Sequence, residues 1–205
     1  SRRYPAIIFD QEREAGDQIL NIENLAAEAD GTILFSDIDL NLAKNDKVVV
    51  YSKDARAATA FYEIMNGKQQ PMAGSFQWGV TTSQSYLPLD NAMHFDQEES
   101  LVDWLRQYAK TDEEREEVFL RGFLGKMLFS GDEALKSAKV LSGGEKVRCM
   151  LSRMMMVRAN VLMLDEPTNH LDLESITAFN NSLIKFKGTV LLTTHDHAFA
   201  QSVGN

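Results

Sequence analysis

The strongest constraint on the fold is a pair of apolar runs near the end of the chain, "VLML" at residues 161–164 and "TVLL" at residues 189–192. Neither run alternates apolar and polar residues, which is typical of strands buried on both faces of a parallel sheet. Between them, "DLESITAFNNSLIKFKG" predicts a capped helix that ends at Gly188. A strand, a helix and a strand at this spacing form a parallel βαβ unit. We therefore expect an α/β fold with a parallel core sheet.

Upstream of this unit, the pattern predicts strands first and helices afterwards. Residues 18–25 and 32–42 read as antiparallel strands, and residues 74–88 as further strand. Residues 48–51 form a short strand that leads into a helix ending at Asn66-Gly67. Residues 98–139 look helical, with Thr111 and Glu114 as the capping box of "DEEREEVFLRGFLGKMLF". The expected architecture is a parallel core sheet, an antiparallel β-subdomain and a helical subdomain over about residues 95–140.

Composition narrows the class of protein. A chain of 205 residues with 44% hydrophobic residues suits one globular domain with a real core. The net charge of −9 disfavours non-specific binding to nucleic acids, whose phosphates would be repelled. The single cysteine, Cys149, fits a reducing compartment. With no run of about 18 apolar residues and a polar start, "SRRYP", we expect neither a membrane span nor a signal peptide; residues 1–16 look like the tail of a linker.

The first motif that could take part in a reaction is "VLMLDEP", which places two acidic residues at the C-terminal end of a buried strand. Ligands of α/β sheets bind at that end. Asp165 would hold Mg²⁺ through water, and Glu166 would polarise the water that attacks a γ-phosphate. The alternative is a strand that simply ends in acids.

The second motif is "LSGGE" at residues 141–145, where Ser142 and Glu145 form a capping box around Gly143 and Gly144. Free backbone N–H groups and the helix dipole make such a helix start an anion site. The alternative is an ordinary capped helix. The apolar residues that follow recur at helical spacing, so one face should be buried: Val147, Met150, Leu151 and Met154.

The third motif is "TTHDH" at residues 193–197, which places His195 after the second apolar run, separated from it by two threonines. A histidine there can hydrogen-bond a γ-phosphate and so sense it. The alternative is a structural histidine.

In this order and spacing, the three motifs together resemble the nucleotide-binding domain of ABC ATPases. "EPTNHLD" at residues 166–172 looks most like the F subfamily, which comprises soluble proteins with two such domains and no membrane part. The resemblance runs from about Leu20 to the end of the chain. It implies ATP and Mg²⁺ as cofactors, and hydrolysis of ATP by in-line attack of water.

The same resemblance places the family's P-loop on residues 52–59, where its phosphate-binding residues have been lost. The three loop glycines and the phosphate-gripping lysine are all replaced, by Ser52, Ala55, Ala57 and Ala58. Glycine is needed there because the cradle uses unusual backbone angles and lets phosphate come close. Thr59 retains the hydroxyl that binds Mg²⁺, and Lys53 and Arg56 are nearby cations that could partly compensate.

Two further positions depart from the family in the same direction. The family's adenine-stacking aromatic falls near Ala29, and its Q-loop glutamine falls on Leu89, five residues after Gln84. Residues that bind the nucleotide in the family are therefore missing at three separated places, whereas the signature, the two acids and the histidine are intact.

A head-to-tail arrangement explains this combination, because in the family each ATP lies between the P-loop of one domain and the "LSGGE" of the other. We expect the C-terminal domain of a cytoplasmic F-type ABC ATPase, joined by residues 1–16 to an N-terminal ABC domain and acting on the ribosome and its tRNA. Residues 142–145 would serve the partner's ATP, and Thr59, Asp165, Glu166 and His195 a weak local site. The alternatives are an ABC transporter's ATPase subunit and an interaction module without catalysis.

Overall fold

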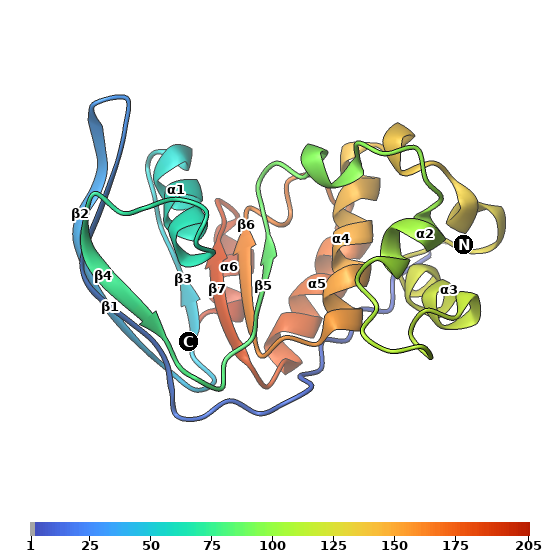
Figure 1. Cartoon of the computed structure of the whole chain (residues 1–205), viewed down its shortest axis with the longest axis horizontal. Helices are drawn as coiled ribbons and strands as arrows, with labels where there is room; N and C mark the ends of the chain where they lie inside the picture. Colours follow the sequence, from blue (N-terminus) through green and yellow to red (C-terminus); the bar gives the residue numbers. More distant parts are fainter. Residues whose placement is uncertain (1–2) are drawn as a thin grey trace. The chain divides into compact units, whose positions relative to one another are not determined.

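The computed structural model describes residues 3–205, which divide into two compact units (Figure 1). We call the first the helical unit; it comprises Asp90–Arg158, Pro167–Phe186 and the N-terminal residues up to Asp10. The second, the sheet unit, comprises Gln11–Leu89, Ala159–Glu166 and Lys187–Asn205. The α/β fold is as expected, with both a parallel and an antiparallel sheet and helices.

The parallel sheet of the sheet unit has the strand order β3-β7-β6-β5, with every neighbouring pair parallel. Its two central strands, β6 (Val161–Asp165) and β7 (Thr189–Thr193), are buried throughout, which confirms the interpretation of the two apolar runs. β3 spans Lys47–Val49 rather than residues 48–51; the Val50 N–H still donates to the Leu192 carbonyl at 2.7 Å, and the chain then leaves the sheet.

The antiparallel sheet has the order β2-β1-β4, with β1 (Gln18–Ala29) and β2 (Thr32–Ala43) longer than the sequence indicated. Residues 74–88, expected as further strand, form two strands that belong to different sheets. β4 (Ala73–Trp78) pairs with β1, and β5 (Gln84–Leu87) pairs with β6. Gly79 lies at the break, where a Cβ atom would come within 2.1 Å of the Gln18 carbonyl oxygen.

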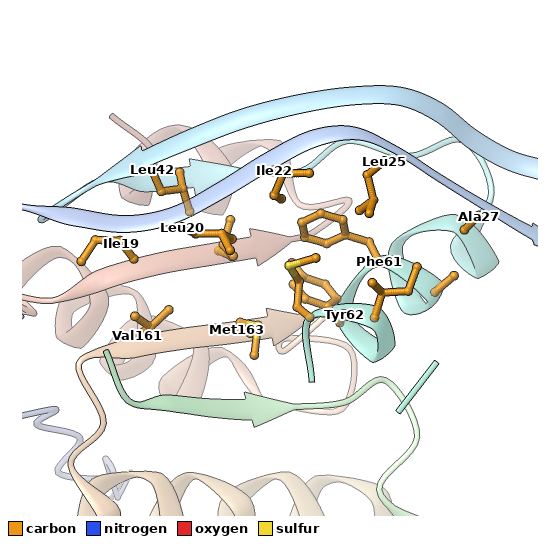
Figure 2. Packing of buried hydrophobic residues seen from close by; sticks show 14 of the residues in the cluster. Ile19, Leu20, Ile22, Leu25, Ala27, Leu42, Phe61, Tyr62, Val161 and Met163 are labelled. Atoms are coloured by element: carbon orange, nitrogen blue, oxygen red, sulfur yellow. The ribbon is translucent and has the colours of Figure 1, made fainter. Parts of the chain in front are cut away.

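Helix α1 (Ala55–Met65) provides the centre of the core in the sheet unit, and it ends at Asn66-Gly67 as predicted. Figure 2 shows β1 passing over α1, with Ile22 and Leu25 near Phe61 and Tyr62. Val161 and Met163 of β6 belong to the same cluster. Since this helix begins directly after the loop at residues 51–54, its packing fixes where the loop lies.

The helical unit contains α2 (Leu101–Arg106), α3 (Glu117–Lys126), α4 (Gly143–Val157) and α5 (Leu173–Lys185), with short 3₁₀ helices at Ala92–Phe95, Gly131–Leu135 and Ala138–Val140. The helical interpretation of this region is confirmed, but two boundaries differ. The Glu114 N–H does donate to Thr111 Oγ1 at 3.2 Å, yet this contact closes a turn, because α3 starts only at Glu117. α5 ends at Lys185, before Gly188, because Phe186 is already extended.

The apolar face predicted for α4 is confirmed, since Val147, Met150, Leu151 and Met154 are all buried. No helix in the described part of the chain is long and apolar enough to cross a membrane. One helix that the sequence did not indicate, α6 (His197–Val203), follows β7 and is capped by Asp196.

The N-terminal segment contains no regular element between residues 3 and 16; its residues up to Asp10 belong to the helical unit, and residues 11–16 belong to the sheet unit. The Ala6 N–H donates to the Lys126 carbonyl at 2.8 Å. The Phe9 ring lies edge-on to Phe179 and Phe186, with centroids 6.0 and 6.3 Å away. The assignment of residues 1–16 as a linker stays a prediction, and residues 1 and 2 lie outside the described part of the chain.

Candidate functional site

The two acids stand at the C-terminal end of β6, as predicted, and Asp165 meets a residue from α1. Thr59 Oγ1 donates to Asp165 Oδ2 at 2.8 Å, and Asp165 is only 2% exposed. The structure thus brings together the two oxygen ligands predicted for Mg²⁺. They fit that ion, which is typically held by one or two protein oxygens together with water and substrate phosphates.

Burial is the main influence on the charge of Asp165. It raises the pKa of this carboxyl to about 6, and the negative charges of Glu166 and Glu63 act in the same direction. The hydrogen bond from Thr59 opposes the rise. Because a bound cation favours the ionised form, this carboxyl is better suited to holding a metal than to standing alone.

Glu166 is held in a strained conformation beside His195. Its backbone φ is 50°, in the left-handed region, and its N–H donates to the Thr193 carbonyl at 2.8 Å. Strain of this kind collects at functional sites. One carboxylate oxygen, Oε2, accepts from the His195 backbone N–H at 3.3 Å.

The second oxygen of Glu166, Oε1, is buried and makes no hydrogen bond within the described residues. His195 Nε2 lies 3.1 Å from it, but the two atoms are not aligned as a hydrogen bond. The His195 side chain is 74% exposed, which argues against a structural histidine. A buried acceptor without a donor, next to an exposed imidazole, is suited to polarising a water molecule.

Tyr62 is a member of this group that the sequence analysis missed. Its hydroxyl lies 2.8 Å from Thr193 Oγ1 and 3.4 Å from the Leu164 carbonyl oxygen, and the residue is fully buried. Burial raises the pKa of this hydroxyl, which therefore stays neutral. Its spacing of three residues from Thr59 on α1 was the available signal, because residues i and i+3 share a helix face.

The loop before α1 is closed by its own side chains. Ser52 Oγ donates to the Asp54 carbonyl at 2.5 Å and accepts from the Asp54 N–H at 3.2 Å. Asp54 caps α1 by accepting from the Arg56 N–H at 2.9 Å, and it pairs with the Arg56 guanidinium at 2.9 Å. The carboxylate of Asp54 therefore occupies the helix start where a phosphate would otherwise bind.

The geometry of this loop does not fit a triphosphate. No residue between 51 and 59, all of which are described, has the positive φ of a glycine cradle. Arg56 is engaged by Asp54, and Ala58 is buried and uncharged. Of the two cations expected to compensate, only Lys53 remains beside the loop.

The signature residues lie in the helical unit, and the predicted capping box is complete. Ser142 Oγ accepts from the Glu145 N–H at 3.2 Å, and Glu145 Oε1 accepts from the Ser142 N–H at 3.1 Å. Lys136 Nζ lies 2.5 Å from Glu145 Oε2, which holds that carboxylate in place. The helix geometry leaves the N–H groups of Gly143 and Gly144 without intrahelical acceptors, so they can meet an anion.

A second reason for the two signature glycines is the close approach of His170, from "NHLD". A Cβ atom on Gly144 would lie 2.5 Å from the His170 carbonyl oxygen. A Cβ atom on Gly143 would lie 3.2 Å from Cγ of the His170 ring. No local pattern indicated this contact, because it joins two segments that are more than 20 residues apart.

The other positions that depart from the family carry no nucleotide-binding group. Ala29 is at the end of β1, Leu89 follows β5, and the side-chain amide of Gln84 donates to Thr82 Oγ1 at 2.8 Å. The side-chain N–H group of Gln84 is therefore already used in a hydrogen bond to a neighbouring residue.

Comparisons with known proteins agree with this geometry. The family model described as "ABC transporter" matches residues 21–169. The chain is 52% identical over its whole length to the "Uncharacterized ABC transporter ATP-binding protein YkpA" of Bacillus subtilis (strain 168), and 34% identical over 99% of its length to the "Probable ATP-binding protein YbiT" of Escherichia coli O157:H7. It spans 38% of the length of each of these relatives.

Solved structures share the fold. One described as "An inward-facing conformation of a putative metal-chelate type ABC transporter" has a TM-score of 0.73 at 21% identity and covers 92% of this chain and 77% of its own. The "RNase-L Inhibitor" has a TM-score of 0.68 at 20% identity and covers 94% of this chain and 37% of its own. With the motifs, the geometry and the family match in agreement, the chain belongs to the ABC family of ATP-binding domains.

Proposed function

We propose that this chain is the C-terminal nucleotide-binding domain of a cytoplasmic F-type ABC ATPase, and that its "LSGGE" helix completes an ATP site on a partner ABC domain. The observation that carries the proposal is a contrast between two helix starts. The start of α4 is capped by the Ser142 hydroxyl and has glycines at its first two positions, whereas the start of α1 is capped by the carboxylate of Asp54. A hydroxyl cap can still donate a hydrogen bond to an anion, but the Asp54 carboxylate repels one.

The partner would be an N-terminal ABC domain of the same longer protein, arranged head-to-tail with this one. The relatives are long enough to hold such a domain, since this chain spans 38% of each. The "EPTNHLD" stretch supports the F subfamily, and through it an action on the ribosome and its tRNA.

In the proposed reaction, the partner's P-loop holds Mg-ATP and this chain supplies hydrogen-bond donors to the γ-phosphate. The donors are the Ser142 hydroxyl and the N–H groups of Gly143 and Gly144, fixed in direction by the capping box. Water then attacks the γ-phosphate in line, giving ADP and phosphate. The local group of Thr59, Asp165 and Glu166 would bind Mg-ATP weakly, because the loop offers no cradle.

The test is steady-state ATPase activity of the longer protein. Ser142→Arg places bulk and side-chain length where the N–H groups should meet the γ-phosphate, so turnover should fall at least about 10²-fold. The matched control is Ser100→Arg, because Ser100 also caps a helix of the helical unit but lies outside the signature. Glu166→Gln should have a much smaller effect. Gly144→Asp is a poor test, because any side chain there meets the His170 carbonyl.

The outcomes separate the alternatives. If Glu166→Gln abolishes turnover and Ser142→Arg does not, the active half-site is the local one and the assignment is wrong. If the longer protein contains membrane helices in place of a second ABC domain, the transporter alternative holds. If the protein has no ATPase activity at all, the chain is an interaction module.

A further inference from the structure

A cavity of about 440 Å³ opens in the sheet unit between β2, β3 and the start of α1. Its volume lies within the range of small-molecule sites. The walls are mostly apolar, from Leu34, Phe35 and Ile38 of β2, Val48 of β3, and Ala58 and Phe61 of α1. The cavity borders the closed loop, since Tyr51, Ser52, Lys53 and Asp54 also line it.

The charges that line the cavity disfavour a polyphosphate. The lining includes one lysine, Lys53, and two aspartates, Asp39 and Asp54; since Arg56 only balances Asp54, these groups offer a polyphosphate no net positive charge. Asp54 is paired with Arg56 at 2.9 Å, and Asp39 accepts from the Asn24 N–H at 2.8 Å. A ligand with several negative charges would meet carboxylates rather than the N–H groups of a phosphate cradle.

The apolar part of the cavity lining favours an uncharged, apolar ligand. Two large apolar side chains lie at the cavity with much of their surface in water, Ile38 at 36% exposure and Tyr51 at 67%. An uncharged ring or branched chain that enters the cavity removes this surface from water, which is the main source of free energy for such binding.

We propose that this cavity binds a small uncharged molecule with an aromatic or branched aliphatic body, in place of a nucleotide. The proposal rests on the geometry of the loop and the lining, and it does not depend on the action of the "LSGGE" helix on a partner. The loss of the P-loop has then changed the chemistry of the site rather than only removing it.

The probe for the test is N-phenyl-1-naphthylamine, an uncharged aromatic amine whose fluorescence rises in apolar surroundings. Saturable binding is expected. Ile38→Glu places a carboxylate at the cavity and should weaken binding by about tenfold or more, because a charge against an apolar ligand loses its water. The matched control is Ile33→Glu on the same strand, since Ile33 is 60% exposed and does not line the cavity; its effect should stay below about twofold.

A second variant, Ala57→Leu, fills part of the cavity without adding charge and should weaken binding as well. Thermal unfolding of each variant confirms that it is folded. Millimolar Mg-ATP should leave the bound probe in place. The proposal is overturned if the probe shows no saturable binding, if the two glutamate variants weaken it equally, or if Mg-ATP displaces it. None of these results bears on the effect of Ser142→Arg on ATPase activity, so the two proposals fail separately.

Discussion

Alanine at each of the two neighbouring signature glycines should have opposite effects on stability. Both residues lie in the first turn of α4, and both face His170. At Gly143 the new Cβ atom meets only the His170 ring, with Cγ at 3.2 Å and Nδ1 at 3.3 Å. At Gly144 it meets the His170 carbonyl oxygen at 2.5 Å, which is backbone and has no rotamer to move to.

The magnitudes follow from two terms. Replacing glycine by alanine within a helix gains about 0.5–1 kcal/mol from the smaller loss of backbone entropy. An overpacked contact costs about 1–3 kcal/mol. The His170 side chain is exposed and can turn away, so Gly143→Ala should lie between neutral and about 1 kcal/mol more stable. Gly144→Ala should be less stable by about 1–2 kcal/mol, because its gain is smaller than the cost of moving two backbone segments.

Urea unfolding followed by tryptophan fluorescence measures both effects, since Trp104 is fully buried in the helical unit. The His170→Ala background sharpens the test. It removes the ring that faces Gly143 but leaves the carbonyl that faces Gly144, so the penalty of Gly144→Ala should persist there. Equal penalties for the two alanine variants, or relief of the Gly144→Ala penalty by His170→Ala, would refute the close-approach argument.

Three further predictions concern the sheet unit. Calorimetry on this chain should show Mg-ATP binding in the high micromolar range or weaker, and Ala58→Lys should not restore it; a Kd of about 1 μM, or about −8 kcal/mol, would contradict this. The pKa of the Asp165 carboxyl is raised to about 6 in the folded state, so the folded protein holds a proton that the unfolded chain has already released. The stability that comes from this proton is lost as pH rises through about 6. Asp165→Asn in metal-free buffer should therefore gain about 1 kcal/mol relative to the unmodified chain between pH 5 and 7, and an unchanged difference would count against the shift. Tyr62→Phe should cost about 1 kcal/mol, measured by urea unfolding, because the buried Thr193 hydroxyl loses its partner.

Features that depend on neighbours within one helix or strand followed from the sequence. The unbroken apolar runs of β6 and β7 could be satisfied only by burial on both faces, and both strands are buried. The capping box of α4 needs only Ser142 and Glu145, three residues apart, so its hydrogen bonds were predictable. The loss of the P-loop glycines was visible for the same reason, because a cradle is a property of consecutive residues.

The sequence was less informative where consecutive strands pair with different neighbours. Nothing local distinguishes β4 from β5, because both are short strands, and their separation depends on pairing with β1 and β6. Thr111 and Glu114 form the expected contact, but packing places the start of α3 later. Strand pairing and helix boundaries are set by tertiary contacts, which overrule local preference.

The tertiary structure alone decided how the site residues meet. Thr59 and Asp165 are 106 positions apart, yet they share a 2.8 Å hydrogen bond because α1 packs beside β6. The left-handed backbone of Glu166 and the approach of His170 to Gly144 likewise depend on contacts that no local pattern encodes. Residue types and spacing set which chemistry is available to this chain, whereas the distances that make it usable arise only when segments far apart in the sequence are packed against one another.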